Sequence, residues 1–429
     1  MPDYNEFVIR DGVLEQYCGN GGRAVIPDGV WCIGKNAFAD CTALTYVTVP
    51  ESVTHIDESA FFGCTSLTEL TLPASLISIG DYAFINCSEL DHITVRSGNP
   101  RYHSLDDCLI ETQTKTLMLG CKNSIIPADG SVTRIAHSAF RGHTGICQIT
   151  IPDTVTEIDY AVFADCINLT AVIIPDSITV LGESVFAGCT SLSRVRLPAT
   201  ISCISEGTFE NCKALAHVTV PPSVALIERH AFRKCTALTA IMLPDSVETV
   251  EDYAFRDCTG LAEFHLPASV TDMEGTALWG CTGLERITVA PDNPNYHARG
   301  NCLIEAHTKT LICGCKNSMI PADGSVTCIA DGAFRSRAPE DLAIPDTVTH
   351  IGWSAFRDCT SLTSLTIPRS VTRIRALAFA GCKGLTSVEI LNTGADVSEY
   401  AFEGCTGLSH VKLGDQLRPI SCYAKKWGT

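Results

Sequence analysis

The chain repeats a 23-residue unit along most of its length, and this period limits the folds that it can adopt. The sequence LTYVTVP at residues 44–50 returns as LTELTLP at residues 67–73. Prolines end this segment at steps of 23 residues in three runs, at positions 27, 50 and 73, then 152, 175, 198, 221, 244 and 267, then 345 and 368. One such unit cannot bury its own apolar side chains, whereas a stack of units shares a continuous core. The repeat therefore predicts a solenoid.

Within each unit, the spacing of the apolar residues predicts a strand. Leu70 and Leu72 are two positions apart, so in a strand both point to one face, while Glu69 and Thr71 point to the other. The proline that follows cannot donate a hydrogen bond to a ladder and therefore ends the strand. We expect these strands to stack in parallel, with leucine, valine and isoleucine inside and with variable residues on the open face.

The rest of the unit predicts a short return path. Val53 and Ile56 indicate a second short strand, and the sequence AFFGC at residues 60–64 indicates one helical or 3₁₀ turn with Phe61 directed inward. The Ala-Phe pair recurs at 37–38, 60–61, 83–84, 231–232, 254–255, 355–356, 378–379 and 401–402. The predicted fold is a right-handed superhelix with a parallel sheet on its concave face, and with short strands and helical or 3₁₀ turns on its convex side.

The repeat divides the chain into three parts. Residues 27–413 are expected to form one solenoid with 17 strand positions, and residues 1–26 and 414–429 to cap its two ends. Such caps are needed because the outer faces of the first and last units would otherwise expose apolar side chains. This organisation leaves no room for a separate catalytic domain.

Two units are longer than the others and mark an internal duplication. Residues 92–140 and 286–334 align without gaps at an offset of 194, with 32 of 49 positions identical. The long coils, 96–126 and 290–320, each contain two apolar runs on either side of a short polar segment, and this pattern predicts a β-hairpin. The tips share their chemistry, which is Thr114-Lys115 in the first copy and Thr308-Lys309 in the second.

The repeat resembles that of the BspA-like leucine-rich-repeat proteins of bacteria. Their units read LTxVxIPxxVxxIGxxAFxxC, and this chain supplies LTSLTIP at residues 362–368 and the remaining positions as Val348, Ile351-Gly352, Ala355-Phe356 and Cys359. Residues 7–14 also resemble the first capping segment of that family. The resemblance covers essentially the whole chain. It implies a leucine-rich-repeat solenoid that binds proteins and acts in adhesion to host or other cells.

Charge and composition argue against several classes of function. The formal net charge is −17 and no basic run occurs, so the chain should repel the phosphate backbone of nucleic acids. No apolar stretch approaches the ~20 residues of a membrane-spanning helix. The start of the chain lacks the basic and apolar segments of a secretory signal, which favours a cytoplasmic location. The family resemblance instead implies secretion or a place at the cell surface, and both alternatives stay open.

The 23 cysteines raise an alternative function in redox chemistry or metal handling. Twelve of them share one position of the repeat, where we expect a buried, reduced thiol that packs as a small apolar side chain. These are Cys41, Cys64, Cys87, Cys166, Cys189, Cys212, Cys235, Cys258, Cys281, Cys359, Cys382 and Cys405. Cys32, Cys203 and Cys328 stand beside an inward isoleucine and are expected to face outward. So many unpaired thiols suit a reducing compartment.

No motif predicts catalysis, a metal site or a cofactor. Cys313-Gly314-Cys315 lacks the spacing of a zinc pair, and the other copy has Leu119 in place of Cys313. His103 and His297 recur with the hairpins, and we interpret them as residues that form hydrogen bonds within loops. The sequence contains no HExxH, GxSxG or P-loop pattern. We therefore expect a protein that is not an enzyme and that binds no cofactor.

Two functions remain open, a binding scaffold and a thiol-rich redox or metal-handling protein. The scaffold is favoured, with a protein or glycan partner recognised by a monomer through the variable residues of the concave face. The candidate binding residues are Tyr46, Glu69, Gln148, Arg194, Arg196, His217, Glu263, His265 and Arg286. The pair Arg194 and Arg196 could receive an anionic group, and the two hairpins could together engage a repetitive or dimeric partner.

Overall fold

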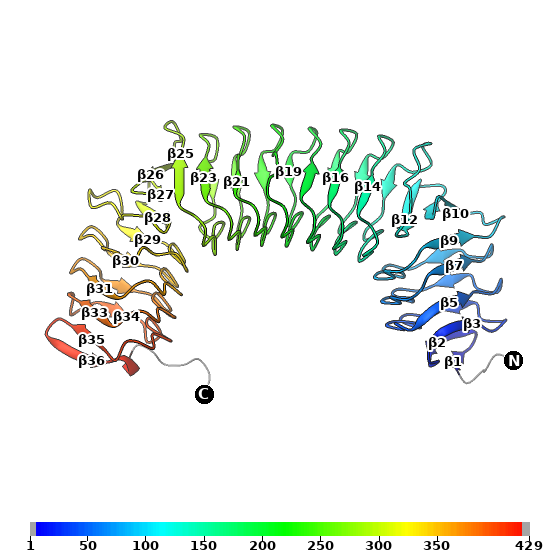
Figure 1. Cartoon of the computed structure of the whole chain (residues 1–429), viewed down its shortest axis with the longest axis horizontal. Coiled ribbons are helices and arrows are strands. Elements are labelled where there is room, and N and C mark those ends of the chain that lie inside the picture. The colour runs from blue at the N-terminus through cyan, green and yellow to red at the C-terminus, as the bar shows by residue number, and fades with distance from the viewer. Residues whose placement is uncertain (1–5, 423–429) are drawn as a thin grey trace. The chain divides into compact units, whose positions relative to one another are not determined.

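The computed structural model of the chain describes residues 6–422, and its regular secondary structure consists almost entirely of short β-strands joined by turns (Figure 1). The chain divides into two compact units. Unit 1 contains Met1–Ile201 and Ser205–Leu215, and unit 2 contains Ser202–Ile204 and Ala216–Thr429. In each unit the chain winds as a β-solenoid whose successive coils pair in parallel, which confirms the predicted fold class. The 3₁₀ helix η2 (Ile420–Cys422) ends the described part.

The coils of unit 1 contribute strands to two kinds of sheet, one on each side of the repeated proline. The first-strand sheets, formed before the proline, contain β3 (Gly22–Val25), β5 (Leu44–Thr48), β7 (Glu69–Leu72) and β9 (His92–Val95), and then β14 (Gln148–Thr150), β16 (Ala171–Ile173) and β18 (Arg194–Arg196). The second-strand sheets contain β1 (Phe7–Arg10), β2 (Val13–Tyr17), β4 (Cys32–Ile33), β6 (His55–Ile56) and β8 (Ser78–Ile79), and then β10 (Tyr102–Leu105), β11 (Cys108–Glu111), β12 (Thr116–Gly120), β13 (Arg134–Ile135), β15 (Glu157–Ile158) and β17 (Val180–Leu181).

Unit 2 repeats this arrangement. Its first-strand sheets contain β21 (Ala240–Ile241), β23 (Glu263–Leu266) and β25 (Arg286–Val289), and then β31 (Ser364–Ile367), β33 (Ser387–Ile390), β35 (His410–Leu413) and β36 (Gln416–Pro419). Its second-strand sheets contain β19 (Cys203–Ile204), β20 (Leu226–Ile227), β22 (Thr249–Val250) and β24 (Asp272–Met273), and then β26 (Tyr296–Arg299), β27 (Cys302–Glu305), β28 (Thr310–Cys313), β29 (Cys328–Ile329), β30 (His350–Ile351), β32 (Arg373–Ile374) and β34 (Asp396–Val397).

The register of the first-strand sheets places the predicted inward residues on one face. Leu70 of β7 pairs with Val47 of β5 and with Ile93 of β9, and all three side chains are buried. The adjacent residues Glu69 and Thr71 lie on the opposite face, where Glu69 is exposed. The inward column is therefore restricted to apolar residues, whereas the outward column is free to vary.

The first-strand ladder is interrupted at four of the predicted positions. Within the described chain, no strand forms at residues 217–220 or 342–344, or before Pro127 and Pro321. Pro221 and Pro222 follow the first of these segments and remove two consecutive backbone donors. In the long coils, β12 and β28 join the second-strand sheets instead. The expectation of a strand at all 17 positions is thus wrong at these four.

The segment that contains the Ala-Phe pair forms hydrogen-bonded turns without becoming a helix. Cys64 N donates to Phe61 O at 3.2 Å, which is the i→i+3 bond of a 3₁₀ turn. Phe61 N, however, donates to Ala83 O of the next coil at 2.8 Å, so it cannot continue a helix. The left-handed backbone of Ser59, with φ 57°, also interrupts helical geometry. The predicted turn therefore retains 3₁₀ hydrogen bonds and forms a third line of contacts between coils.

Each long coil forms a three-stranded antiparallel meander. In unit 1, β11 pairs with β10 on one side and with β12 on the other, and in unit 2 β27 pairs likewise with β26 and β28. The pairs β11–β12 and β27–β28 lie where the sequence predicts hairpins, and the third strand was not predicted. Because β12 and β28 then pair in parallel with β13 and β29, the meanders are part of the second-strand sheets.

Antiparallel strands stand at both ends of the described chain. β1 pairs with β2 within the predicted cap 1–26, and β36 pairs with β35 and opens the predicted cap 414–429. Residues 1–5 and 423–429 of these caps lie outside the described residues.

Stacked phenylalanine rings run through the core of each unit. In unit 1, the ring centroids of Phe38 and Phe61 lie 4.9 Å apart, with an angle of 9° between the ring planes. In unit 2, the Phe356 and Phe379 centroids lie 5.1 Å apart, with an angle of 2°. This separation approaches the spacing of neighbouring strands in a sheet, so adjacent regular coils that carry the phenylalanine stack their rings directly on one another.

We predict that Phe232→Ala lowers the free energy of unfolding by about 3–5 kcal/mol, the usual cost of deleting a buried phenylalanine ring. Phe232 is fully buried and stacks on Phe255 at 5.3 Å. Thermal unfolding would measure the change, with Met242→Ala, at an exposed side chain of the same unit, as the control. A wild-type melting temperature for Phe232→Ala would show that this ring does not support the core.

Candidate functional site

The outward side chains of the first-strand sheets form rows in each unit, which together we call the first-strand face. Eight of the nine predicted binding residues are exposed on it, and the ninth, Tyr46, is half-buried. The Arg23 guanidinium covers the Tyr46 ring, with Cζ 4.3 Å from the ring centroid. The row includes His217, although that residue lies in a segment without strand pairing. The repeat therefore predicts correctly which side chains point outward.

A groove of about 680 Å³ opens on the first-strand face of unit 1. It is lined by residues of β14 and β16, by the loops that follow them, and by Arg196 of β18. Of the predicted binding residues, Gln148 and Arg196 line this groove. Its most exposed apolar side chain is Ile173, which is 64% exposed and is not among the predicted binding residues.

An ion pair fixes one wall of this groove. Arg196 Nη2 lies 2.6 Å from Asp176 Oδ2, and Arg196 Nη1 donates to Ile174 O at 3.2 Å. The other carboxylate oxygen of Asp176 accepts the Ala199 amide at 2.8 Å. This amide hydrogen bond and the Arg196 contact hold the pKa of Asp176 below its usual value. Arg196 is therefore held in place, and its side chain is still 52% exposed.

Two adjoining grooves open on the first-strand face of unit 2. One, of about 470 Å³, is lined in part by His217, Ala240 and Met242, and the other, of about 280 Å³, shares the last two residues. Three predicted binding residues line the second groove, namely Glu263, His265 and Arg286. Met242, 84% exposed, stands where the two grooves meet.

The remaining predicted residues lie outside these three grooves. Tyr46 and Glu69 occupy neighbouring strands near the start of unit 1, and Arg194 lies on β18 beside the unit 1 groove. The grooves therefore bring together six of the nine predicted residues in two separate sets, one in each unit.

The predicted hairpin tips belong to a different surface. Thr114 Oγ1 donates to Glu111 Oε2 at 2.6 Å, and the carbonyl of Lys115 accepts the Thr133 amide of the next coil at 2.9 Å. In the other copy, the Lys309 carbonyl accepts the Thr327 amide in the same way, and Thr308 hydrogen-bonds to Glu305. Both tips are exposed, but they lie in the second-strand sheets, whereas Arg194 and Arg196 lie in a first-strand sheet.

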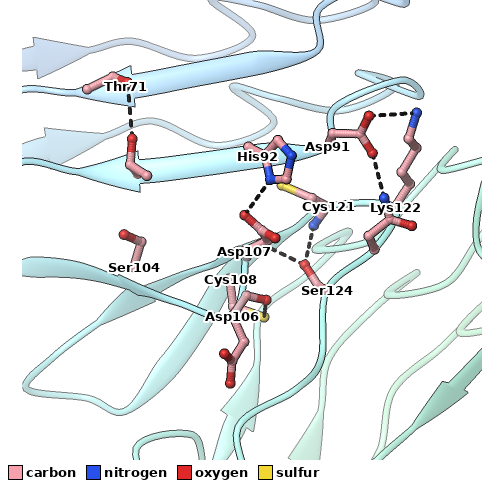
Figure 2. A network of polar contacts seen from close by, with 12 residues as sticks. Thr71, Asp91, His92, Ser104, Asp106, Asp107, Cys108, Cys121, Lys122 and Ser124 are labelled. Carbon is pink, nitrogen blue, oxygen red and sulfur yellow. Dashed lines mark hydrogen bonds and ion pairs between the residues drawn. The ribbon is translucent and has the colours of Figure 1, made fainter.

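A network of polar contacts attaches the first meander to the first-strand sheet (Figure 2). His92 Nδ1 lies 3.1 Å from Asp107 Oδ1, and this hydrogen bond, with the charge of Asp107, raises the pKa of His92. Ser124 Oγ donates to Asp107 O at 2.6 Å, and Lys122 Nζ pairs with Asp91 at 3.0 Å. The hydroxyl of Ser124 is thus engaged with the backbone and is not bound to His92.

The second copy forms the corresponding contacts with different chemistry. Arg286 and Asn301 stand where the first copy has His92 and Asp107. Asn301 Nδ2 donates to Glu285 O at 2.8 Å, and Asn301 Oδ1 accepts the Ile287 amide at 3.3 Å. The link between the meander and the first-strand sheet is present in both copies, whereas the titratable pair His92 and Asp107 is present only in the first. The network therefore positions the meander and needs no reactive histidine.

Comparison with known proteins identifies the family. Six copies of the BspA type leucine rich repeat region match residues 9–128, 113–239, 227–299 and 313–425, which together cover most of the chain. The chain belongs to the BspA-type leucine-rich-repeat family. No curated protein matches it.

Solved structures similar to this BspA-type chain share its fold. A leucine-rich repeat protein from Eubacterium ventriosum is 24% identical, with a TM-score of 0.54, over 62% of this chain and 78% of that one. A leucine-rich repeat protein from Bacteroides ovatus is 24% identical, with a TM-score of 0.50, over 94% of this chain and 91% of that one. Among residues 6–422 of the BspA-type chain, no helix is long and apolar enough to span a bilayer.

The repeated cysteines of this BspA-type chain form a column of hydrogen bonds to backbone carbonyls. Cys189 Sγ donates to Phe163 O of the preceding coil at 3.0 Å, and Cys166 Sγ donates to Phe140 O at 3.1 Å. The same contact recurs for Cys64, Cys87, Cys212, Cys258, Cys281, Cys359, Cys382 and Cys405. A thiol at this position therefore fills space and also satisfies a buried acceptor, a role that sequence reasoning missed.

The predictions for individual cysteines are corrected at two positions. Eleven of the twelve repeated cysteines are buried, but Cys41 is partly exposed. Cys32, predicted to face outward, is buried, and its thiol lies 3.5 Å from Asp57 Oδ2, while Cys203 and Cys328 are partly exposed. The 22 cysteines whose side chains the structure describes are all free of disulfides, and no metal-binding group of three or more His, Cys, Asp or Glu occurs in that part of the chain.

Burial makes these thiols poor nucleophiles. It raises the pKa of Cys87, Cys166 and Cys281 to about 12, so the thiols are protonated at neutral pH. The thiolate is the form that attacks disulfides and binds metals. The core column therefore does not favour the redox or metal-handling alternative.

We predict that an alkylating reagent first labels Cys18 and Cys147, which are exposed, and leaves the buried column unlabelled in the folded protein. Mass spectrometry of the labelled peptides would map the sites, with a denatured sample as the positive control. Rapid labelling of Cys189 and its equivalents, or a stoichiometric metal in the purified protein, would revive the alternative function.

Two coils replace the cysteine of the column by a basic residue. His143 and Arg337 follow the two meanders at equivalent positions of the duplication. His143 is only 1% exposed and neither ring nitrogen has a hydrogen-bond partner, so burial, with a contribution from Lys122, lowers its pKa to about 4. Arg337 is also buried, and its Nη2 lies 3.1 Å from the sulfur of Cys313.

We predict that His143 destabilises the protein in mild acid. The unfolded chain protonates this ring below about pH 6.5, whereas the folded chain does so only near pH 4, so stability is lost as the pH falls between these values. The loss should reach roughly 3 kcal/mol. His143→Cys, which restores the residue of the repeat, should remove this part of the acid sensitivity in melting curves at pH 7, 6, 5 and 4.

The exposed His217→Gln serves as the control for this measurement, and its pH profile should follow that of the wild type. If His143→Cys lost as much stability between pH 6.5 and 4 as the wild type, the buried ring would not be its source.

Proposed function

We propose that this BspA-type chain is a non-catalytic scaffold that binds a protein partner through the grooves of its first-strand face. The observation that carries the proposal is the contrast between the two faces of each strand. Leu70 and its equivalents are apolar in every first strand and are buried in most of them, with Ile149 and Val195 partly exposed. The outward row, in contrast, changes between charged, polar and apolar residues and opens into grooves. Solenoids use such extended surfaces for recognition.

The composition of the grooves supports a protein partner over a glycan. Ile173 in unit 1 and Met242 in unit 2 are large apolar side chains in contact with solvent, and each is accompanied by an arginine that lines a groove on the same face. Exposed methionine adapts to irregular apolar surfaces, and arginine is enriched at the centres of protein interfaces. The grooves, which lie within the described residues, are lined by no tryptophan or tyrosine that could stack on a sugar ring.

The hairpin tips are not part of this proposed surface. They lie in the second-strand sheets and are bound to the next coil through their backbone. Bivalent binding by the two tips remains a separate idea that shortening one hairpin would test. Adhesion, which the family resemblance implies, would use the first-strand face.

We predict that Ile173→Glu and Met242→Glu each weaken capture of a partner, because a buried, unpaired carboxylate at an interface is costly. Matched controls are Val180→Glu on a second-strand sheet of unit 1 and Met319→Glu in unit 2, since these side chains are 52% and 76% exposed. Arg194→Ala with Arg196→Ala tests the cationic side of the unit 1 groove. Chemical crosslinking in bacterial and host-cell lysates, with quantitative mass spectrometry, would compare all variants.

The proposal requires that at least one protein is crosslinked to the wild type and to both control variants. The same protein must be recovered less with at least one groove variant. Equal recovery of every captured protein by the groove variants and the controls would contradict it.

A further inference from the structure

A column of arginines lies on the turn side of unit 2. The position that follows the repeated phenylalanine, or Leu278 in its place, is basic or aromatic in five successive turns of this unit, which are Arg233, Arg256, Trp279, Arg335 and Arg357. The same position in unit 1 holds Ala39, Phe62, Ile85, Arg141, Ala164, Ala187 and Glu210. A chain with a net charge of −17 thus concentrates arginine at one repeat position of one unit.

Aromatic rings form a layer beneath these arginines. The Arg335 guanidinium lies over the Trp279 ring, with Cζ 5.7 Å from its centroid, and the Trp279 and Trp353 rings are 5.9 Å apart. Arg256 lies over Tyr253 in the same way, with Cζ 5.2 Å from the ring centroid. Cation–π contacts of this kind hold a guanidinium flat and leave its outer edge available.

The charges of this cluster are incompletely balanced. Arg256 and Arg357 each face the aspartate that follows them, at 3.5 Å, and no carboxylate of the described chain lies within ion-pair distance of Arg335. Burial, together with the like charges of Arg357 and Arg256, lowers the pKa of Arg335, although Asp358 and Asp257 act in the opposite direction. Arg335 is therefore a half-buried cation without a direct counterion.

One donor in the same cluster also lacks an acceptor. Trp279 Nε1 is buried and has no hydrogen-bond partner, and Trp279 as a whole is buried. An unsatisfied donor beside an uncompensated cation is costly for a fold, and an anion with several oxygens would satisfy both needs.

We propose that Arg256, Arg335 and Arg357 form a site for a small oxyanion that carries two or more charges, of the phosphate or sulfate class, next to Trp279. Guanidinium groups recognise such anions through paired hydrogen bonds. The strongly acidic remainder of the chain repels an extended polyanion, so the ligand is a small molecule or a single group on a larger one. The site lies at the turns of unit 2, away from the first-strand face, and is independent of the proposed scaffold function.

Titration with inorganic pyrophosphate at low ionic strength tests this site, because screening weakens contacts between exposed charges as salt is added. Calorimetry would measure binding to the full chain, and tryptophan fluorescence would report on Trp279 and Trp353. We expect saturable binding that Arg335→Gln weakens by at least about tenfold, the effect of losing roughly 1.4 kcal/mol of interaction. Pyrophosphate should bind more tightly than monovalent nitrate.

Arg373→Gln is the matched control, since it removes the same charge from an exposed arginine of unit 2 outside the cluster, where Arg373 faces Asp396 at 3.4 Å. This variant should bind pyrophosphate like the wild type. If Arg335→Gln unfolds, the double variant Arg256→Gln with Arg357→Gln keeps the cation over Trp279 and should show the same loss.

Three results would overturn the proposal. They are the absence of saturable pyrophosphate binding by the wild type, equal binding by the cluster variants and the wild type, and equal loss in Arg373→Gln, which would indicate a general effect of charge.

Discussion

A regular coil of the solenoid is bound to its neighbours by backbone hydrogen bonds at three places, and the rest of the structure depends on this constraint. The first-strand and second-strand ladders provide two of them, and the third is the line of turn amides represented by Phe61 N and Ala83 O. The three lines can be kept only if every coil follows the same path. A fixed path requires side chains of fixed size inside it, which explains why leucine, phenylalanine and cysteine recur while the outward row does not.

The constraint also explains how the long coils are accommodated. Each long coil has eight residues more than the regular repeat and cannot keep all three lines of hydrogen bonds to its neighbours. The meanders show which of these lines is retained. β12 and β28 preserve the second-strand ladder, while the first-strand ladder is interrupted before Pro127 and Pro321. The next coil then carries His143 or Arg337 where a thiol would stand. The insertions therefore alter the core of the following coil as well as the surface.

Much of this architecture could be predicted because the regular spacing of apolar residues in the sequence indicates the backbone geometry of each coil. The spacing of Leu70 and Leu72 correctly assigned the inward and outward faces, and the duplication correctly located the hairpins. The third strand of each meander, β10 and β26, was missed because a short strand with mixed residues has no distinctive pattern. The grooves could not be predicted either, since Ile173 and Met242 become conspicuous only when their exposure is known. The arginines of the column are visible in the sequence, but they stand 22 or more residues apart. A binding role could be inferred only from the structure, which shows the aromatic rings that lie beneath them.

The strand β36 gives the solenoid a property that its coils alone would lack. The two faces by which a coil contacts the coils before and after it differ, so the contacts are head-to-tail and do not form a closed set. If such contacts continued from one molecule to the next, they would build a filament. β36 runs antiparallel to β35, is exposed along its whole length and carries Arg418 and Pro419, which are poor templates for a further strand. A four-residue segment thus presents a poor template for a further coil at this edge, and duplicating a block of coils elsewhere in the chain leaves that edge unchanged.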